Sequence, residues 1–336
     1  DRVGDQLAQK ISFLAQLSKG TNKSVAQLWP VYTSMVQAST SALVTLPTHT
    51  ALRAKFMVII HRMVLCLDAG LLEYLPHALP LLIAHMACSD VDNEAQRDSE
   101  AMVQLVNQLI IKYEERLFPV LEPHLMQLLQ RFIELMPKQP AGPGSTVPPH
   151  VGAVVLGLQR HYFLVVQHVV AHKLSHILLS AQQRPHLEQV LHTVLSGIIE
   201  IDDPVSRKTC LSVMVFLVKS WVPDGPKAGL DANAHGAFVG FVMEKVVPGA
   251  LRSVLAPGFR VKDAGSLRVA VEISTLLHAL SSTLGPPFVQ ALVGEILPAL
   301  EFPADLGQQL GVALSGPPLS EVQKVLRSCI QQVHQR

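Results

Sequence analysis

Residues 48–86 read THTALRAKFMVIIHRMVLCLDAGLLEYLPHALPLLIAHM, and this stretch decides the fold. Its first half predicts an amphipathic helix, because apolar residues recur every three or four positions, which is the helical period. Residues 68–70 are expected to end that helix, with Gly70 in the left-handed conformation. The second half predicts another helix, which Pro76 and Pro80 should bend. The two apolar stripes are Leu52, Phe56, Ile60, Met63 and Leu67, then Leu72, Leu75, Leu79, Ile83 and Met86.

Both predicted helices are also apolar away from these stripes. A helix with apolar residues on several sides must pack between neighbours, and a stacked array of helix pairs supplies such neighbours. The sequence therefore favours an α-solenoid over a compact bundle. The additional apolar positions are Ala51, Met57, Val64, Leu65, Ala78 and Leu82.

The composition fits a helical repeat protein. The chain has 336 residues, enough for two ordinary domains or one long repeat array. Hydrophobic residues make up 49% of it and aromatic residues only 5%, so Leu, Val and Ala must do most of the packing. Charged residues are 16%, below the usual quarter, which indicates surface buried between repeats or a piece of a larger protein. The absence of an initial Met also favours a fragment.

Several functional classes are disfavoured by what the sequence lacks. The net charge of +1 creates no global field for nucleic acid, so such binding would need local patches. Cys66, Cys88, Cys210 and Cys329 form no CxxC pair, which argues against a disulfide framework or zinc site and fits a reducing intracellular compartment. No apolar run approaches the roughly 18 residues of a membrane span. Nucleotide-binding and hydrolase motifs are missing, so no enzyme and no cofactor is expected.

Prolines recur at a nearly constant interval in the first helix of the predicted pairs. The step is 46 residues from Pro30 to Pro76 and 47 to Pro123, and Pro248 and Pro298 are 50 apart. A period in the forties, a bent first helix such as 23–46, and Asp-Pro-x-x-Arg at 203–207 are marks of HEAT repeats. We therefore expect an all-α, α-α superhelix (HEAT-repeat solenoid, ARM-repeat-like) over residues 1–336. It should contain about six helix pairs and two Pro/Gly-rich flexible insertions, 137–149 and 223–234.

Local sequence adds a resemblance to a known family. The run HRMVLCL at 61–67, followed by Leu75-Pro76, resembles the exportin-T family, the tRNA exportins among the importin-β-type karyopherins. Further stretches resemble the same family in the same order, and together they match only its C-terminal part. They are LVNQLI at 105–110, YFL at 162–164, AHKLS at 171–175, Arg207-Lys208 with Phe216 and KSW at 219–221, and FPADL at 302–306.

This resemblance implies a shuttling function between nucleus and cytoplasm. Such a carrier would bind tRNA together with Ran in its GTP form in the nucleus, and release both in the cytoplasm after GTP hydrolysis. It would also contact nuclear pore proteins, with no membrane partner. Two alternatives stay open, namely a generic HEAT scaffold that binds protein partners and another cargo receptor of the importin-β family.

In importin-β-like solenoids the second helices line the concave surface, where bases would meet phosphates. Seven side chains are therefore tRNA-binding candidates, with Arg252 as a further base. Alternatively they are ordinary solvated charges, or Arg53 and Arg207 pair with repeat-loop acids such as Asp203. Lys55 and Arg62 lie seven apart on one helix stripe, Arg207 and Lys208 open another second helix, and Arg260, Lys262 and Arg268 stand against a single acid, Asp263.

Two further clusters have a plain structural explanation. His161, His168, His172 and His176 include i,i+4 steps that zinc can use, but no Glu accompanies them. We expect no metal there and a helix face partly buried against its neighbour. In the acidic pair at 202–203, the first residue is expected to cap the next helix rather than to act in catalysis.

Overall fold

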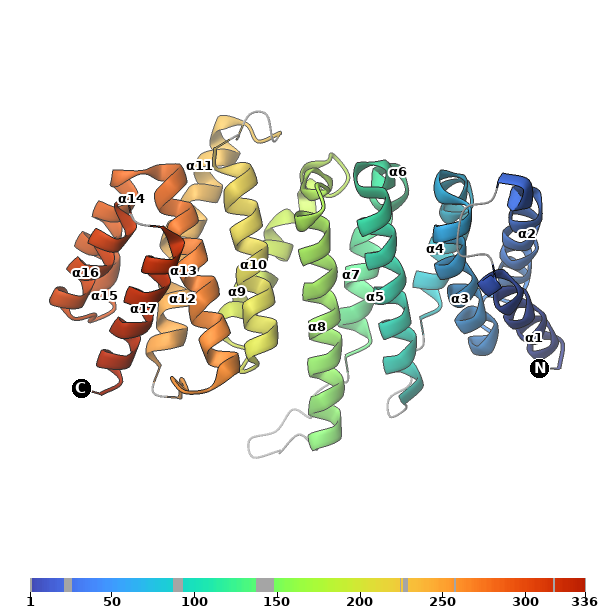
Figure 1. Ribbon diagram of the computed structural model, residues 1–336, viewed down its shortest axis with the longest axis horizontal. Helices are drawn as coiled ribbons and strands as arrows, with labels where there is room; N and C mark the ends of the chain where they lie inside the picture. The colour runs from blue at the N-terminus through green and yellow to red at the C-terminus, as the bar shows by residue number, and fades with distance from the viewer. Residues whose placement is uncertain are drawn as a thin grey trace. The chain divides into compact units, whose positions relative to one another are not determined.

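The computed structural model describes residues 2–20, 26–86, 93–136, 148–223, 225, 229–256, 258–316 and 318–335. Every regular element in these ranges is helical, and they contain no strand. The helices form two compact units, Asp1–Ile177 (unit 1) and Leu178–Arg336 (unit 2). Figure 1 labels the helices in chain order. Within each unit, helices stack side by side in two layers, so the predicted all-α solenoid class is confirmed.

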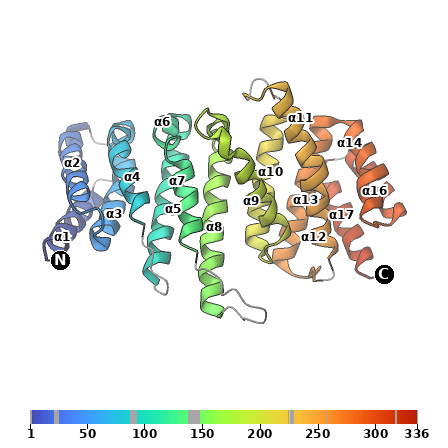
Figure 2. The same cartoon turned by 180° about the vertical axis from the view of Figure 1, so that it is seen from behind.

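The helices of unit 1 form two layers. The first layer contains α1 (Arg2–Leu17), α3 (Thr50–Cys66), α5 (Asn93–Tyr113) and α8 (Pro149–Ala171), each packed against the next. The second contains α2 (Trp29–Thr45), α4 (Leu75–Ala84) and α7 (Leu125–Glu134), with the short α6 (Phe118–Leu121) before α7 (Figure 2). Single 3-10 turns at Asp68–Glu73 and Glu114–Leu117 carry the chain from the first layer to the second.

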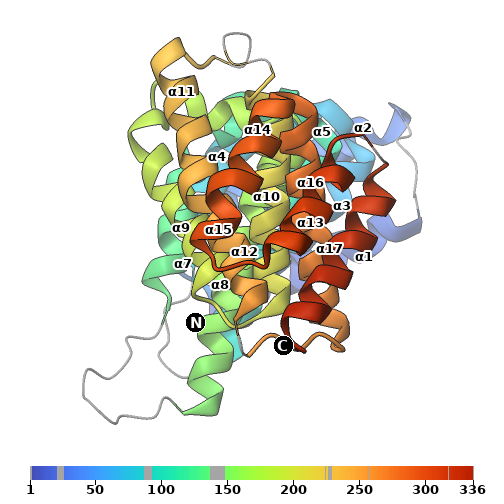
Figure 3. The ribbon, with the colours of Figure 1, turned by 90° about the vertical axis from the view of Figure 1, so that its left-hand side faces the viewer.

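Unit 2 repeats this arrangement. Its first layer contains α10 (Pro204–Trp221), α13 (Ala264–Leu284) and α17 (Leu319–Val333). Its second layer contains α9 (Leu187–Ile199) and the segment formed by α11 (Ala232–Phe241) and α12 (Val247–Leu255). The chain then passes through α14 (Pro286–Ala291), α15 (Leu297–Ala299) and α16 (Ala304–Leu314). Helix α17 packs against both α16 and α13 (Figure 3).

The apolar stripe predicted for α3 forms its buried side. Leu52, Phe56 and Met63 are inaccessible to solvent, and Ile60 and Leu67 nearly so. The apolar positions of α3 outside this stripe are not all buried, because α3 contacts α1, α2 and α5 but leaves one side open. On that open side Ala51 is exposed, and Leu65 is 49% exposed. On the predicted second stripe, Leu75, Leu79, Ile83 and Met86 are buried, while Leu72 is half-buried.

The repeated prolines of unit 1 lie at helix starts or in a turn, not in the middle of a helix as predicted. Pro30 and Pro76 lie in the first turns of α2 and α4, where a missing N–H is not needed. Of the predicted helix 23–46, the structure describes a 3-10 turn at Ala26–Leu28 and an α-helix that begins at Trp29. Pro123 lies in the turn between α6 and α7. Pro80, which is not one of the repeated prolines, sits inside α4.

In unit 2 the chain accommodates its prolines by a different device. A π-helical turn at Val242–Val246 ends two residues before Pro248, and another at Leu292–Ile296 ends two residues before Pro298. Proline removes one hydrogen bond of the helical ladder and crowds the preceding turn. The wider π turn relieves this crowding without ending the segment. Both helices therefore continue as α12 and α15.

Two details of the helix ends differ from the predictions. Asp68, not Gly70, adopts the left-handed conformation after α3, with φ 46°. Aspartate tolerates this conformation better than most residues because its short polar side chain can bond locally. Before α10, the side chain of Asp203 rather than Asp202 accepts the capping hydrogen bond, from the Ser206 N–H at 2.8 Å.

The predicted insertions are described only in part. Residues 137–147 lie outside the described residues, and Pro149 already begins α8. The stretch 223–234 is less loose than predicted at its end. There Leu230 is buried and the Asp231 side chain caps α11 by accepting from the Ala234 N–H at 2.8 Å.

Helix α8 has the length and hydropathy of a membrane-spanning helix, which the sequence analysis did not expect. It is the only such helix in the part of the chain that the structure describes. Core helices of globular proteins pass the same test. In unit 1, α8 packs against α5 and α7, and 39% of its most apolar window is buried.

Candidate nucleic-acid interface

The start of α10 holds one predicted contact residue in a structural bond. Arg207 is half-buried, and its guanidinium donates to the backbone oxygen of Ile201 at 3.0 Å, which closes the turn before the helix. The Asp203 carboxylate, the alternative partner, accepts from the Ser206 N–H at 2.8 Å and from the Ser206 hydroxyl at 2.7 Å. Lys208 is also half-buried. These two bases therefore offer limited reach to a ligand.

The start of α13 is more open. Arg260, Lys262 and Arg268 are all exposed, in the loop before the helix and in its first turns. The one acid among them, Asp263, caps α13 by accepting from the Ser266 N–H at 2.8 Å. This bond lowers the pKa of Asp263, and the charge of Arg260 contributes to the shift. Because Asp263 is the one acid beside these three bases, the start of α13 carries a local positive charge.

Arg252 belongs to the other layer. It lies in the last turn of α12 and lines a shallow hollow together with Glu244 and Glu295. It is therefore separated from the α13 bases by the packing of α12 on α13.

Lys55 and Arg62 lie in unit 1, apart from the other five candidates. Lys55 is exposed on α3, as predicted from the stripe. Arg62 is half-buried, and its guanidinium donates to the backbone oxygen of Ser18 at 3.0 Å, just beyond α1. The same side of α3 exposes Val58 and Leu65, so its surface is partly apolar. Of this pair, only Lys55 is open to a ligand along its whole side chain.

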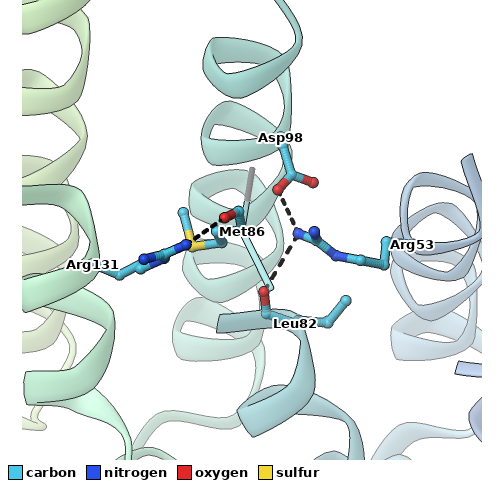
Figure 4. A network of polar contacts seen from close by, with 5 residues as sticks. All are labelled: Arg53, Leu82, Met86, Asp98 and Arg131. Atoms are coloured by element: carbon cyan, nitrogen blue, oxygen red, sulfur yellow. Dashed lines mark hydrogen bonds and ion pairs between the residues drawn. The ribbon is translucent and has the colours of Figure 1, made fainter. Parts of the chain in front are cut away.

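Arg53, which the sequence offered as a partner for a repeat-loop acid, is a core residue. Its side chain is 2% exposed and forms an ion pair with Asp98 of α5. It also donates to the backbone oxygen of Leu82, near the end of α4, at 3.4 Å. From the other side, Arg131 of α7 donates to the backbone oxygen of Met86 at 2.8 Å (Figure 4). Burial lowers the pKa of Arg53, while Asp98 opposes the shift.

The four histidines of the α8 region do not gather in one cluster. His161 lies 3.3 Å from the Ser99 hydroxyl, the rings of His168 and His172 stack at 5.5 Å, and His176 stacks on Phe118 at 4.8 Å. Burial lowers the pKa of His161 and His168. In the described ranges no three His, Cys, Asp or Glu side chains gather as a metal site would require.

Sequence reasoning missed two bases that share the first layer of unit 2 with α10 and α13. Lys324 and Arg327 are exposed on α17, which packs against α13. The signal that could have found them is their three-residue spacing, which puts both on one side of a helix otherwise rich in Gln and Ser.

Comparison with known proteins identifies one family across nearly the whole chain. The family model described as Exportin-T matches residues 6–334. Exportin-T of Homo sapiens is 27% identical over 334 residues, and that of Danio rerio is 26% identical over 334 residues. Each alignment covers 98% of this chain and 32% of the relative. Exportin-T of Oryza sativa subsp. japonica is 26% identical over 343 residues, covering 98% of this chain and 33% of the relative.

Proposed function

Because the chain belongs to the exportin-T family, we propose that it is part of a nuclear export receptor for tRNA that works with Ran in its GTP form. The family match over residues 6–334 is the observation that carries this proposal. The chain spans about a third of the length of the curated relatives it matches. The proposal therefore concerns the whole receptor, to which this region contributes a part of the RNA-binding surface.

In this proposal the open bases of unit 2 neutralise phosphates. Arg260, Lys262 and Arg268 supply the local charge that a net charge of +1 cannot supply globally. Contacts with phosphates position an RNA without reading its bases. Folded RNA is recognised largely through its shape and backbone, which suits a receptor for many tRNA species.

The remaining candidates differ in how directly they can contact RNA. Lys55 is a phosphate contact of unit 1, whereas Arg62 and Arg207 hold helix ends and Lys208 lies half-buried beside Arg207. Ran and nuclear pore proteins are partners of the whole receptor, which shuttles between nucleus and cytoplasm. Its role is transport, with no catalytic step and no cofactor.

The test measures binding of tRNA to the full-length protein, with and without Ran-GTP. We expect tight, salt-dependent binding only when Ran-GTP is present. Failure to bind tRNA in its presence would exclude tRNA export and favour the scaffold alternative. Substituting Lys262→Ala with Arg268→Ala should weaken binding and flatten its salt dependence. The matched pair Arg116→Ala with Lys245→Ala, both exposed and neither a candidate contact, should leave both unchanged.

A further inference from the structure

A hollow runs between α13 and α17 in the first layer of unit 2. Its volume is about 410 Å³. Its floor on the α13 side is apolar, with Leu267, Ala270 and Val271. The α17 side is polar and carries two bases and no acid, namely Gln323, Lys324, Arg327, Ser328 and Gln331.

The two bases of this hollow are available to a ligand. Arg327 is exposed and has no hydrogen-bond or ion-pair partner among the described residues. Lys324 lies 3.8 Å from Glu321, but its side chain is 78% exposed, so solvent screens that pair. Arg268 follows the lining residue Leu267 and adds a third exposed base beside the hollow.

The nearest acid on α13 is already engaged. Glu272 follows the lining residue Val271, and its carboxylate accepts a hydrogen bond from the Ser212 hydroxyl at 2.7 Å. Ser212 belongs to α10, on the side of α13 away from α17. With Glu272 and Glu321 counted against Lys324, Arg327 and Arg268, the balance of charge around the hollow is +1.

We propose that the hollow between α13 and α17 binds the sugar–phosphate backbone of one RNA strand, an inference that rests on the proposed function. Bases three residues apart on a helix are separated by roughly 5–6 Å, close to the spacing of neighbouring phosphates along a strand. Lys324 and Arg327 then contact successive phosphates. The amides of Gln323 and Gln331 and the Ser328 hydroxyl can bond ribose hydroxyls, which an acidic peptide does not offer.

The test uses a double variant of the full-length protein that carries both Lys324→Gln and Arg327→Gln. Its tRNA binding in the presence of Ran-GTP is compared with that of wild type. Removing one phosphate contact should lower the slope of log K against log salt by roughly 0.7–0.9. At physiological salt, removing two such contacts corresponds to a roughly tenfold to thirtyfold weaker affinity. The matched pair Arg116→Gln with Lys245→Gln, both exposed and neither a candidate contact, should keep wild-type affinity and slope, and circular dichroism melting should be the same for all three proteins.

Each outcome separates this inference from the proposed function. If wild type binds tRNA and the α17 pair retains its affinity and slope, the hollow is not an RNA site, although the export function stands. If wild type binds no tRNA, both proposals fall. Competition by a polyglutamate peptide as strong as that by tRNA would also overturn the assignment, because it would show that the site reads negative charge rather than RNA backbone.

Discussion

Asp68 and Glu114 lie 46 residues apart and share a left-handed backbone, each with φ 46°. Each residue follows a helix of the first layer of unit 1, α3 or α5. Each carboxylate is paired at 3.0 Å with a lysine near the end of the next helix, Asp68 with Lys112 and Glu114 with Lys173. The repeat period seen in the prolines is thus also present in the geometry and charge of the helix ends.

The left-handed conformation predicts the effect of replacing Glu114. Glycine adopts it without steric cost, so Glu114→Gly should leave the free energy of unfolding unchanged or raise it by up to about 1 kcal/mol. The exposed pair with Lys173 contributes little. Glu114→Val, by contrast, should lower the free energy by about 1–2 kcal/mol, because a β-branched residue is strained there. Urea denaturation of both variants measures this, and an equal loss in both would show that the side chain matters more than the backbone.

The buried ion pair of Arg53 and Asp98 predicts that removing one charge destabilises the protein strongly and that removing both charges restores most of the stability. Asp98→Asn should lower the free energy of unfolding by about 3 kcal/mol or more, because it leaves a guanidinium buried without its counter-charge. Combining Arg53→Met with Asp98→Leu should recover most of that loss, since no charge is then buried. Arg97→Ala, at an exposed neighbouring position, is the control. If Asp98→Asn unfolds at the wild-type urea midpoint, the pair does not stabilise unit 1.

Substitutions of Lys55 and Arg62 should differ in their effect on the free energy of unfolding, although the sequence places both residues on one stripe of α3. Arg62→Ala removes a charged donor from the Ser18 carbonyl and should lower the free energy of unfolding by about 1–2 kcal/mol. Lys55→Ala should change it by less than about 0.5 kcal/mol, because the side chain is exposed. Thermal melting of the two single variants distinguishes these roles, and equal melting temperatures would contradict them.

The histidines packed near α8 predict a loss of stability in mild acid. Burial lowers the pKa of His161 and His168, with the charge of His172 adding to the shift at His168 and Glu100 opposing it at His161. The unfolded chain then binds more protons. This contribution to stability is complete above the unfolded pKa near 6.5 and is lost as pH falls through the lower folded values.

Urea midpoints at pH 7.5 and pH 5.0 test this dependence. The wild-type midpoint should fall on acidification, and the fall should be smaller in a variant with His161→Gln and His168→Gln. His77→Gln, at an exposed position on α4, should behave as wild type. A pH dependence unchanged by the double substitution would assign the effect to other groups.

Much of the fold could be predicted because helices are encoded locally. The apolar period of α3 reports burial directly, and Leu52, Phe56 and Met63 are all inaccessible. The left-handed residue after α3 could not be assigned in the same way, because Gly70 has the stronger intrinsic preference. The selection of Asp68 instead depends on long-range partners, since Lys112 binds its carboxylate and the Tyr113 hydroxyl donates to its carbonyl at 2.7 Å.

The candidate interface was less predictable for the same reason. Sequence shows which residues are basic but not which guanidinium groups reach a carbonyl about 44 residues away, as Arg62 does at Ser18. It also does not show that α17 lies against α13, which brings Lys324 and Arg327 beside Leu267. The exposure of the bases near the start of α13 is easier to predict, because it follows from a position in or next to the loop before a capped helix.

The last turn of α4 has a consequence for how unit 1 comes apart. Repeat arrays held together by nearest-neighbour stacking can unzip from an end, one repeat at a time. Here Arg53 of α3 binds the Leu82 carbonyl in that turn, and Arg131 of α7 binds the Met86 carbonyl two residues after α4, from the opposite side. Fraying of α4 would strand two guanidinium groups at once, one of them in the core. Amide hydrogens of α3, α4 and α7 should therefore exchange in a single cooperative opening, not in sequence along the chain.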